Sequence, residues 1–327
     1  MRGLSALSPW ADSAQPLRRL RAARISSALR ELLAAGPPPG QVESVHSAAI
    51  NLRFGSSLAT IARESVGGLP MGIQLVGEPS LDQVGVSRGM QVVLHGSNLT
   101  IHDAGTVVAL GAAASWSPAM PIPPELSADR RWRRIEATLR LAVPLAPAIG
   151  LAPLLPVLAG EPRAVRGTLA ERVRMALVDV LELLAAGEMA LAVERARPLI
   201  GLGPGATPSG DDLLVGLLAG LTAIRHPLAA TLASGVAAQA AGRTTALSEQ
   251  FLADAGRLRF SERAQRTTAA VLVGGPAELR SAVLSTLAWG ASSGADLLAG
   301  ILIGIGADLP MLARSLRGLP GQAEAAA

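Results

Sequence analysis

The sequence predicts an α+β protein, in which an N-terminal antiparallel β module (a small barrel or a sandwich) is followed by an all-helical domain with an internal helix repeat. Three observations support this prediction. Apolar and polar residues alternate with period two between residues 41 and 110, and turns interrupt them at short intervals. Beyond Ser127 the apolar residues recur at helical spacing. Within that second half, two segments match each other at an offset of 84 residues.

The first 40 residues are expected to form a basic helix and a proline-rich linker. Residues 16–35 place Leu and Ile at helical spacing among several arginines, and Pro37-Pro38-Pro39-Gly40 ends that pattern. Met1–Gln15 has no continuous apolar stretch, so no signal peptide is expected there.

The β module is assigned to residues 41–125. Met90, Val92 and Leu94 alternate with their neighbours before Gly96-Ser97-Asn98 turns the chain, and 99–102 alternates again before the turn at 103–105. Residues 51–63 break in the same way at Gly55-Ser56. Short alternating runs with closely spaced turns are typical of an antiparallel meander.

The helical domain is assigned to residues 126–317, followed by a flexible tail at 318–327. Thr168 and Glu171 form a capping box that begins a helix ending near Ala186. Further helices are predicted at 188–197, 211–224, 227–241, 245–255, 261–273, 276–288 and 294–306. Leu141–Gly160 has no charge but contains four prolines, which predicts a buried connector and not a membrane span.

The composition excludes several kinds of chemistry. The 327 residues include no Cys and no Lys, which excludes a thiolate nucleophile, an iron–sulfur cluster, a Walker A nucleotide site and a pyridoxal phosphate (PLP) Schiff base. A net charge of +4 is mild for this length and gives no indication of nucleic-acid binding. We expect a cytoplasmic protein that acts on a small anionic substrate, without a membrane or nucleic-acid partner.

The internal repeat pairs Ser209-Gly210-Asp211-Asp212 with Ser293-Gly294-Ala295-Asp296, and each copy continues as an apolar helix with Gly-xxx-Gly. A glycine inside a helix costs about 1 kcal/mol relative to Ala, so its presence indicates a close backbone approach. We therefore predict two buried helices that cross at their glycine faces about a pseudo-two-fold axis. Their polar starts are expected to face a shared cleft.

Two interpretations of these starts are open. In the first, Ser-x-x-Asp is a capping box, with Ser209 and Ser293 as caps and Asp212 and Asp296 opposing the helix dipole. In the second, the starts bind a ligand, which accounts for Asp211 and for the glycine- and proline-rich loop at 201–208.

Other candidate groups lie in the same half of the chain. The cofactor is left unknown, and the paired Asp211 and Asp212 could hold Mg²⁺ through one of the two carboxylates. Arg243 suits an anionic substrate, and Thr245 is either a helix cap or a ligand. The four histidines show no metal-ligand spacing, and structural roles are expected for them.

Several motifs resemble the AllH family, whose namesake is a subunit of oxamate carbamoyltransferase from bacterial ureide breakdown. They are the Gly-Pro-Gly-Ala-Thr-Pro-Ser-Gly-Asp-Asp string within Leu199–Gly216, Thr244-Thr245-x-Leu-Ser248, Ser292-Ser-Gly-x-Asp296, Ser44-Val-His-Ser with Asn51-Leu-Arg53, and Gly89-Met90 with Ala114-x-Trp116. The resemblance covers most of the chain from about residue 40 onward. The family usually has a His in the Gly-x-x-Ser-Gly segment, where Ala291 stands here.

The resemblance implies a subunit that works with AllG-like and FdrA-like partners and moves a carbamoyl group between oxalurate and phosphate, giving oxamate and carbamoyl phosphate. Its implied catalytic residues are Thr207, Ser209, Asp211, Asp212 and Asp296, which would orient the carbonyl and hold the carbamoyl NH₂ or Mg²⁺. Its implied substrate-binding residues are Gly203, Gly205, Gly210, Arg243, Thr244, Thr245, Ser293 and Gly294. Two alternatives are a non-catalytic subunit that binds a ligand or scaffolds its partners, and a structural domain whose repeated motifs are only caps.

Overall fold

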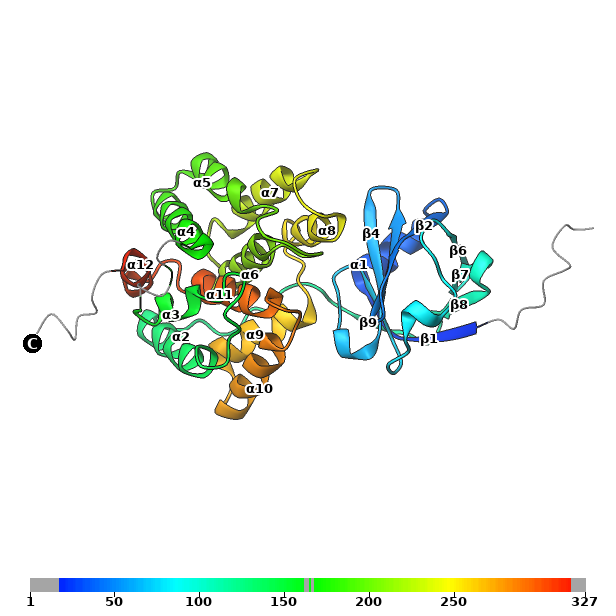
Figure 1. The fold of residues 1–327 in the computed structure, drawn as a ribbon, viewed down its shortest axis with the longest axis horizontal. Coiled ribbons are helices and arrows are strands. Elements are labelled where there is room, and N and C mark those ends of the chain that lie inside the picture. The colour runs from blue at the N-terminus through cyan, green and yellow to red at the C-terminus, as the bar shows by residue number, and fades with distance from the viewer. Residues whose placement is uncertain (1–17, 162–164, 166–167, 319–327) are drawn as a thin grey trace, which may run out of the picture. The chain divides into compact units, whose positions relative to one another are not determined.

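The computed structural model describes residues 18–161, 165 and 168–318, and within them the chain forms two compact units (Figure 1). One unit comprises residues 18–25, 29–66 and 72–116, and the other comprises 26–28, 67–71 and 117–318. The expectations for residues 1–17 and for the tail at 319–327 lie outside the described residues.

The first unit is a β-barrel, which confirms the predicted β module and selects the barrel over the sandwich. The strand order is β5-β4-β3-β2-β6-β7-β8-β1, and a pairing of β5 with β1 closes the ring, with β9 beside β1. The strands are β1 (Arg18–Ser26), β2 (Gly40–Val45), β3 (Ala49–Phe54), β4 (Ser57–Ala62), β5 (Gly72–Leu75), β6 (Gln91–His95), β7 (Asn98–Ile101), β8 (Thr106–Ala109) and β9 (Ala114–Trp116). The sheet is mixed and not purely antiparallel, because β1 pairs with β8 and β4 pairs with β5 in parallel.

The predicted helix at 16–35 is wrong over its first half. Residues 18–26 form strand β1, and only α1 (Ser27–Ala34) is helical. Leu20 pairs with Val108 of β8, and Ile25 pairs with Ile73 of β5. Arg, Leu and Ala favour helices locally, but this strand closes the barrel, and tertiary pairing overrides local propensity.

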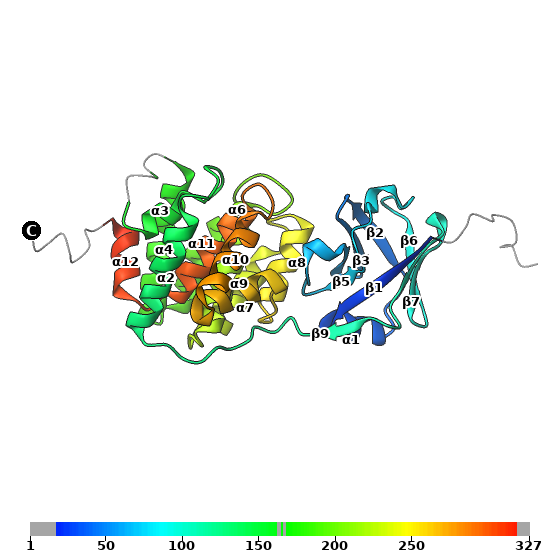
Figure 2. The same ribbon diagram turned by 90° about the horizontal axis from the view of Figure 1, so that it is seen from below.

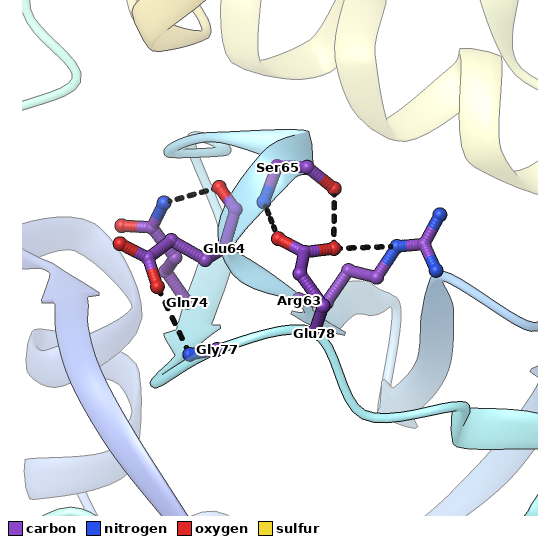
Figure 3. A network of polar contacts seen from close by, with 6 residues as sticks. All are labelled: Arg63, Glu64, Ser65, Gln74, Gly77 and Glu78. Atoms are coloured by element: carbon purple, nitrogen blue, oxygen red, sulfur yellow. Dashed lines mark hydrogen bonds and ion pairs between the residues drawn. The ribbon is translucent and has the colours of Figure 1, made fainter.

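Apolar side chains fill the barrel, and a polar network fixes one of its connections. The interior includes Ile25, Ile50, Leu52, Ile61, Ile73, Leu75, Val92, Leu99, Ile101 and Val108, each exposed by 1% or less. The carboxylate of Glu78 accepts a hydrogen bond of 2.7 Å from Ser65 Oγ and pairs with Arg63 at 3.0 Å (Figure 3). The Gly77 amide donates to Glu64 Oε2 at 3.0 Å. These bonds tie the segment that follows β5 to the segment that follows β4. Strands β4 and β5 are parallel neighbours in the sheet.

The second unit is helical, and the eight helices predicted in it are confirmed to within three residues at each end. The helices of this unit are α2 (Ala128–Ala142), α3 (Leu154–Leu158), α4 (Leu169–Ala185), α5 (Met189–Ala196), α6 (Ser209–Ala223), α7 (Ala229–Ala240), α8 (Ala246–Ala255), α9 (Glu262–Val273), α10 (Pro276–Leu287), α11 (Ser293–Ile305) and α12 (Pro310–Arg317). The short α3 lies inside the segment predicted to be an irregular buried connector. Among the described residues, no helix has both the length and the apolar character that crossing a membrane requires.

Arginine side chains bind the carbonyl groups at the ends of two helices. Arg134 donates to the carbonyls of Ala270 and Val271 at the end of α9, at 2.6 and 2.7 Å. Arg131 donates to Ile305 O at the end of α11 at 3.1 Å and pairs with both oxygens of Asp308 at 2.7 Å. Because the last carbonyls of a helix lack partners within it and carry a partial negative charge, a cation there stabilises the helix.

The repeated helices α6 and α11 lie side by side in the middle of the helical unit (Figures 1 and 2). A Cβ atom added to Gly216 would lie 2.2 Å from Leu297 O, and one added to Gly300 would lie 2.1 Å from Leu213 O. One turn further on, added Cβ atoms at Gly220 and Gly304 would meet carbonyls of the opposite helix at 2.5 and 2.2 Å. The equivalent glycines face each other in the same order, so the helices run parallel and the predicted pseudo-two-fold crossing is confirmed.

Replacing Gly300 with Ala tests this crossing. In an ordinary helix the change stabilises by about 1 kcal/mol, because Gly has the poorer helix propensity. Here the new methyl group overlaps Leu213 O, so we expect the free energy of unfolding to fall by about 2 kcal/mol or more. The matched control is Gly275→Ala at the start of α10, where the new Cβ meets only Glu278 Oε2, at 4.0 Å. Urea unfolding in which both variants behave alike would contradict the close approach.

Candidate functional site

The starts of α6 and α11 meet, as the repeat predicted, and four hydroxyl groups join them. Thr207 Oγ1 lies 3.0 Å from Ser293 Oγ, and Ser209 Oγ lies 3.4 Å from Ser292 Oγ. Parallel helices that touch along their glycines bring their first turns to the same end. The sequence therefore builds one polar cluster from two segments 84 residues apart.

The carboxylates of this cluster are bound across the pseudo-two-fold axis. Ser293 donates a hydrogen bond to Asp212, and its repeat equivalent Ser209 donates to Asp296. Asp296 Oδ1 also accepts a hydrogen bond of 2.7 Å from the amide of Leu151. Each repeated serine thus serves the aspartate of the opposite helix.

The capping interpretation of Ser209 and Ser293 is therefore wrong. The N-cap residues are Pro208 and Ser292, and neither side chain makes a capping hydrogen bond. Ser209 and Ser293 are the first residues inside their helices, where their side chains face the opposite helix. By contrast, Thr168 and Thr245 are confirmed as caps, since each accepts a hydrogen bond from the amide three residues later.

Asp212 and Asp296 are buried with spare hydrogen-bonding capacity. They are 4% and 0% exposed, and within the part of the chain that the structure describes the Oδ2 atom of each has no hydrogen-bond partner. Burial raises the pKa of Asp212 well above its ordinary value, the bond from Ser293 opposes the rise, and the charge of Asp296 adds to it. Burial also raises the pKa of Asp296, against its hydrogen bonds. The pair retains protons at a higher pH than exposed aspartates do, and its Oδ2 atoms lack donors.

Asp211 has a different role, because both of its oxygens are already engaged. Oδ1 accepts a hydrogen bond of 2.8 Å from the Gly201 amide, and Oδ2 accepts a short one from the Thr244 hydroxyl. Thr245 Oγ1 donates to Ala206 O at 2.6 Å. Asp211 and the 244–245 segment together hold the glycine-rich loop in place.

The glycine-rich loop and the helix starts offer fewer amide donors than the sequence suggested. Gly203 and Gly205 adopt positive φ angles of 111° and 104°, which other residues rarely adopt. The Gly210 amide donates to Leu202 O at 2.9 Å, and the Gly294 amide donates to Trp289 O at 2.9 Å. Added Cβ atoms at Gly210 and Gly294 would lie 2.0 and 1.7 Å from backbone oxygens. These two glycines serve close packing, and their amides are not available to an anion.

Arg243 does not join the aspartate cluster. Its side chain is exposed and lines a surface hollow with Arg197, Glu194 and Ile200, and its backbone carbonyl lies against Gly201. Ala291 is also exposed, at the turn that precedes α11.

A small cavity of about 20 Å³ lies beside Asp212, with room for one water-sized group. Its walls include Asp212, Val215, Phe251, Phe260, Trp289 and Leu297. The three aromatic residues of this cavity were not predicted from the sequence. The chain has only three Phe and four Trp, so the clustering of three of these seven at one carboxylate is the feature that could have indicated them.

The metal-binding potential of the site rests on Asp212 and Asp296. Among residues 18–161, 165 and 168–318, no group of three or more His, Cys, Asp and Glu side chains is arranged to hold a metal ion. Mg²⁺ is often held by one or two carboxylates, with water and substrate oxygens completing its shell. Asp212 and Asp296 each have an oxygen without a hydrogen-bond donor, which suits this role, whereas Asp211 has none.

The fold and site define an α+β protein with a two-helix repeat whose paired aspartates form a buried polar cluster. Two family models match the sequence: the AllH family N-terminal domain over residues 21–115, and oxamate carbamoyltransferase subunit AllH over residues 199–305. The chain therefore belongs to the AllH family, as its motifs predicted. No curated protein and no solved structure matches the chain significantly.

A further buried carboxylate, Asp254 on α8, provides a test by pH. It is 1% exposed, and burial raises its pKa from 3.8 to about 6, opposed by a hydrogen bond from Gln250. The folded chain therefore binds this proton more tightly than the unfolded chain. The contribution of Asp254 to the free energy of unfolding is therefore complete below pH 3.8, and it is lost as the pH rises from 3.8 to about 6. At about 1.4 kcal/mol per pH unit, the loss is about 3 kcal/mol.

We expect Asp254→Asn to remove this contribution to the pH dependence. The free energy of unfolding, measured with urea between pH 4 and pH 7, should fall less steeply with pH in the variant than in the parent protein. Parallel pH profiles for the two proteins would show that Asp254 is not protonated in the folded state.

Asp211→Asn should destabilise the protein by about 1 kcal/mol, because the two hydrogen bonds to a carboxylate from Gly201 and Thr244 become weaker neutral ones, with the Asn NH₂ donating to the Thr244 hydroxyl. Thr244→Val removes one of these donors. In a double-mutant cycle the two changes should therefore be non-additive, with a coupling of about 1 kcal/mol measured by urea unfolding. Strict additivity would contradict the role of Asp211 in holding the loop.

Proposed function

We propose that this protein is a subunit of a carbamoyltransferase that moves a carbamoyl group between oxalurate and phosphate, giving oxamate and carbamoyl phosphate. Family membership supports the association with carbamoyl transfer. The observation that carries the proposal is the buried carboxylate of Asp212, which has one oxygen without a hydrogen-bond partner among the described residues and which lines a small cavity. A carbamoyl group ends in NH₂, and a buried acceptor without a donor suits such a group.

The hydroxyl groups around this carboxylate supply the other contacts that carbamoyl transfer needs. A substrate carbonyl that develops negative charge requires hydrogen-bond donors fixed in advance. The hydroxyl oxygens of Thr207 and Ser293 lie 3.0 Å apart, beside Asp212. Both residues are half-buried, so each is partly exposed at the surface of the helical unit. In this proposal the bound substrate replaces the internal hydrogen bonds of these hydroxyl groups. Thr207, Ser209 and Ser293 then donate to the carbonyl, and Asp212 holds the terminal amino group.

The anionic parts of the substrates require cations or free amides. Gly203, Gly205 and Arg243 lie in or next to the loop that Asp211 holds, and we assign them to phosphate or carboxylate binding. Arg243 is exposed on the hollow that it shares with Arg197, so a second subunit can complete that part of the site. AllG-like and FdrA-like proteins are the proposed partners, because the family is named for a subunit.

The alternative is a ligand-binding or scaffolding subunit without chemistry of its own. The resemblance to the AllH family favours it through Ala291, because that resemblance implies a His at this position. Under this alternative an Ala291→His variant has no effect on turnover by the complex. If the segment takes part in catalysis, the same variant changes kcat.

Asp212→Asn tests the proposal directly. The purified chain is combined with its candidate partner subunits, and carbamoyl phosphate formed from oxalurate and phosphate is measured. The amide presents one acceptor in place of the carboxylate, and loss of a charged hydrogen bond is worth about 1.5–3 kcal/mol. We therefore expect kcat/KM to fall by about 10- to 150-fold, while the melting temperature does not fall, since the buried charge is removed.

The matched control is Asp254→Asn, a buried aspartate on α8 that does not line the cavity. Its kcat/KM should equal that of the parent complex. The proposal is rejected if no combination of subunits forms carbamoyl phosphate, or if both variants lose activity equally.

A further inference from the structure

The cavity lined by Asp212 also has a cationic residue in its wall, Arg259. Of the other residues that line it, all but Ser261 are apolar or aromatic. Arg259 is half-buried, and the cavity is partly open to solvent. Its enclosed volume of about 20 Å³ takes one end of a small ligand, so the rest of that ligand extends toward the open side. A residue that can bind an amino group and a residue that can bind an anion therefore line one cavity.

The backbone at the end of helix α8 positions Arg259. The Leu258 amide donates to Ala255 O at 2.8 Å, and the Arg259 amide donates to Asp254 O at 2.9 Å. This pair of bonds is the pattern of a Schellman motif, in which the left-handed position is usually a glycine. Leu258 stands there instead, with a φ angle of 56°. Backbone in this region is strained for a leucine, and such strain is concentrated at functional sites.

A neighbouring segment fixes the same stretch of backbone from the other side. Arg259 forms an isolated antiparallel bridge with Ala119, and the Phe260 amide donates to Pro118 O at 2.7 Å. An arginine on a backbone fixed in this way loses less conformational freedom when it binds a ligand than an arginine on a mobile loop does.

The substrate of the proposed reaction has two ends that match this wall. Oxalurate, H₂N–CO–NH–CO–COO⁻, carries an amino group at one end and a carboxylate at the other. The planar guanidinium of arginine binds a carboxylate through two parallel hydrogen bonds. Phosphate is a second anion and needs a cation of its own. Arg243 offers one, since it lines a different hollow together with Arg197.

We propose that Arg259 binds the carboxylate of oxalurate while Asp212 holds its terminal amino group, which leaves Arg243 to bind phosphate. This inference rests on the proposed function and adds to it the residue that selects an anionic substrate. In the reaction a phosphate oxygen bonds to the carbamoyl carbon, the bond from that carbon to the inner nitrogen breaks, and this nitrogen takes up the proton that phosphate releases. The carboxylate stays on the oxamate product and takes no part in these steps.

Arg259→Gln tests the assignment in the reconstituted complex. Because the carboxylate does not change during the reaction, its contact with Arg259 is equally strong in the bound substrate and in the transition state. Loss of a hydrogen bond to a charged group corresponds to a factor of about 10 to 150. We therefore expect the KM for oxalurate to rise about 10- to 150-fold, with kcat and the KM for phosphate unchanged.

The amide of oxalurate, in which –CONH₂ replaces the carboxylate, provides the matched substrate. The parent complex should use oxalurate at least about tenfold better in kcat/KM than this amide, and Arg259→Gln should remove that preference. Arg259→Lys keeps the charge but not the paired hydrogen bonds, so its KM for oxalurate should lie between those of the parent and Arg259→Gln. This second variant decides the outcome if Arg259→Gln does not fold.

The control is Arg257→Gln, which removes an exposed arginine two residues earlier that does not line the cavity. Its KM for oxalurate and for phosphate should equal those of the parent complex. Three results overturn the assignment of Arg259 while the proposed reaction stands: equal use of oxalurate and its amide by the parent complex, an unchanged preference in the Arg259 variants, or the same loss in Arg257→Gln.

If no complex turns over oxalurate, the proposed function fails, and calorimetric titration of the purified chain decides on Arg259. Binding of oxalurate at least about tenfold tighter than binding of its amide, with the difference lost in Arg259→Gln, supports a carboxylate site in a binding subunit. Equal binding of both compounds, or binding of neither, overturns it.

Discussion

The rest of the helical unit depends on the close parallel contact of α6 and α11. Two helix backbones can approach this closely only where both lack side chains, and Gly216, Gly220, Gly300 and Gly304 meet that requirement from both sides. Because the glycines match in the same order, the helices run parallel, and both N-terminal turns lie at one end. Four hydroxyl groups and two aspartates are thereby gathered at a position that neither helix could create alone. The low helix propensity of glycine is offset by packing across this contact.

The aspartates at these helix starts have divided roles. Asp211 is satisfied at both oxygens and holds the loop, so it acts as a structural residue. Asp212 and Asp296 are buried with one oxygen each lacking a donor in the described structure, an arrangement that lowers stability when they ionise. Asp254 is also buried with an oxygen that lacks a partner, so this property alone does not define a site, whereas Asp212 in addition lines a cavity. Asp212 lines a cavity together with Phe251, Phe260 and Trp289, and the proposed carbamoyl subsite lies there.

Much of this arrangement was predictable from the sequence, and the failures have identifiable causes. The 84-residue repeat predicted the glycine crossing and the meeting of the two starts, because a strong local pattern occurred twice. Strand β1 was missed, since its partners Val108 and Ile73 are distant in the chain and its own residues favour helix. The capping interpretation failed because Ser209 and Ser293 bind across the crossing. Asp211 could not be distinguished from Asp212 by spacing, since the difference lies in contacts with Gly201, Thr244 and Ser293.

The most direct test of the central claim, that Asp212 receives the terminal amino group of a carbamoyl compound, is an experimental structure of the assembled complex with oxalurate bound. The account predicts that the terminal nitrogen lies within about 3.2 Å of a carboxylate oxygen of Asp212. Oxalurate bound elsewhere, for example beside Arg243 and Arg197 with the Asp212 cavity unchanged, would contradict it.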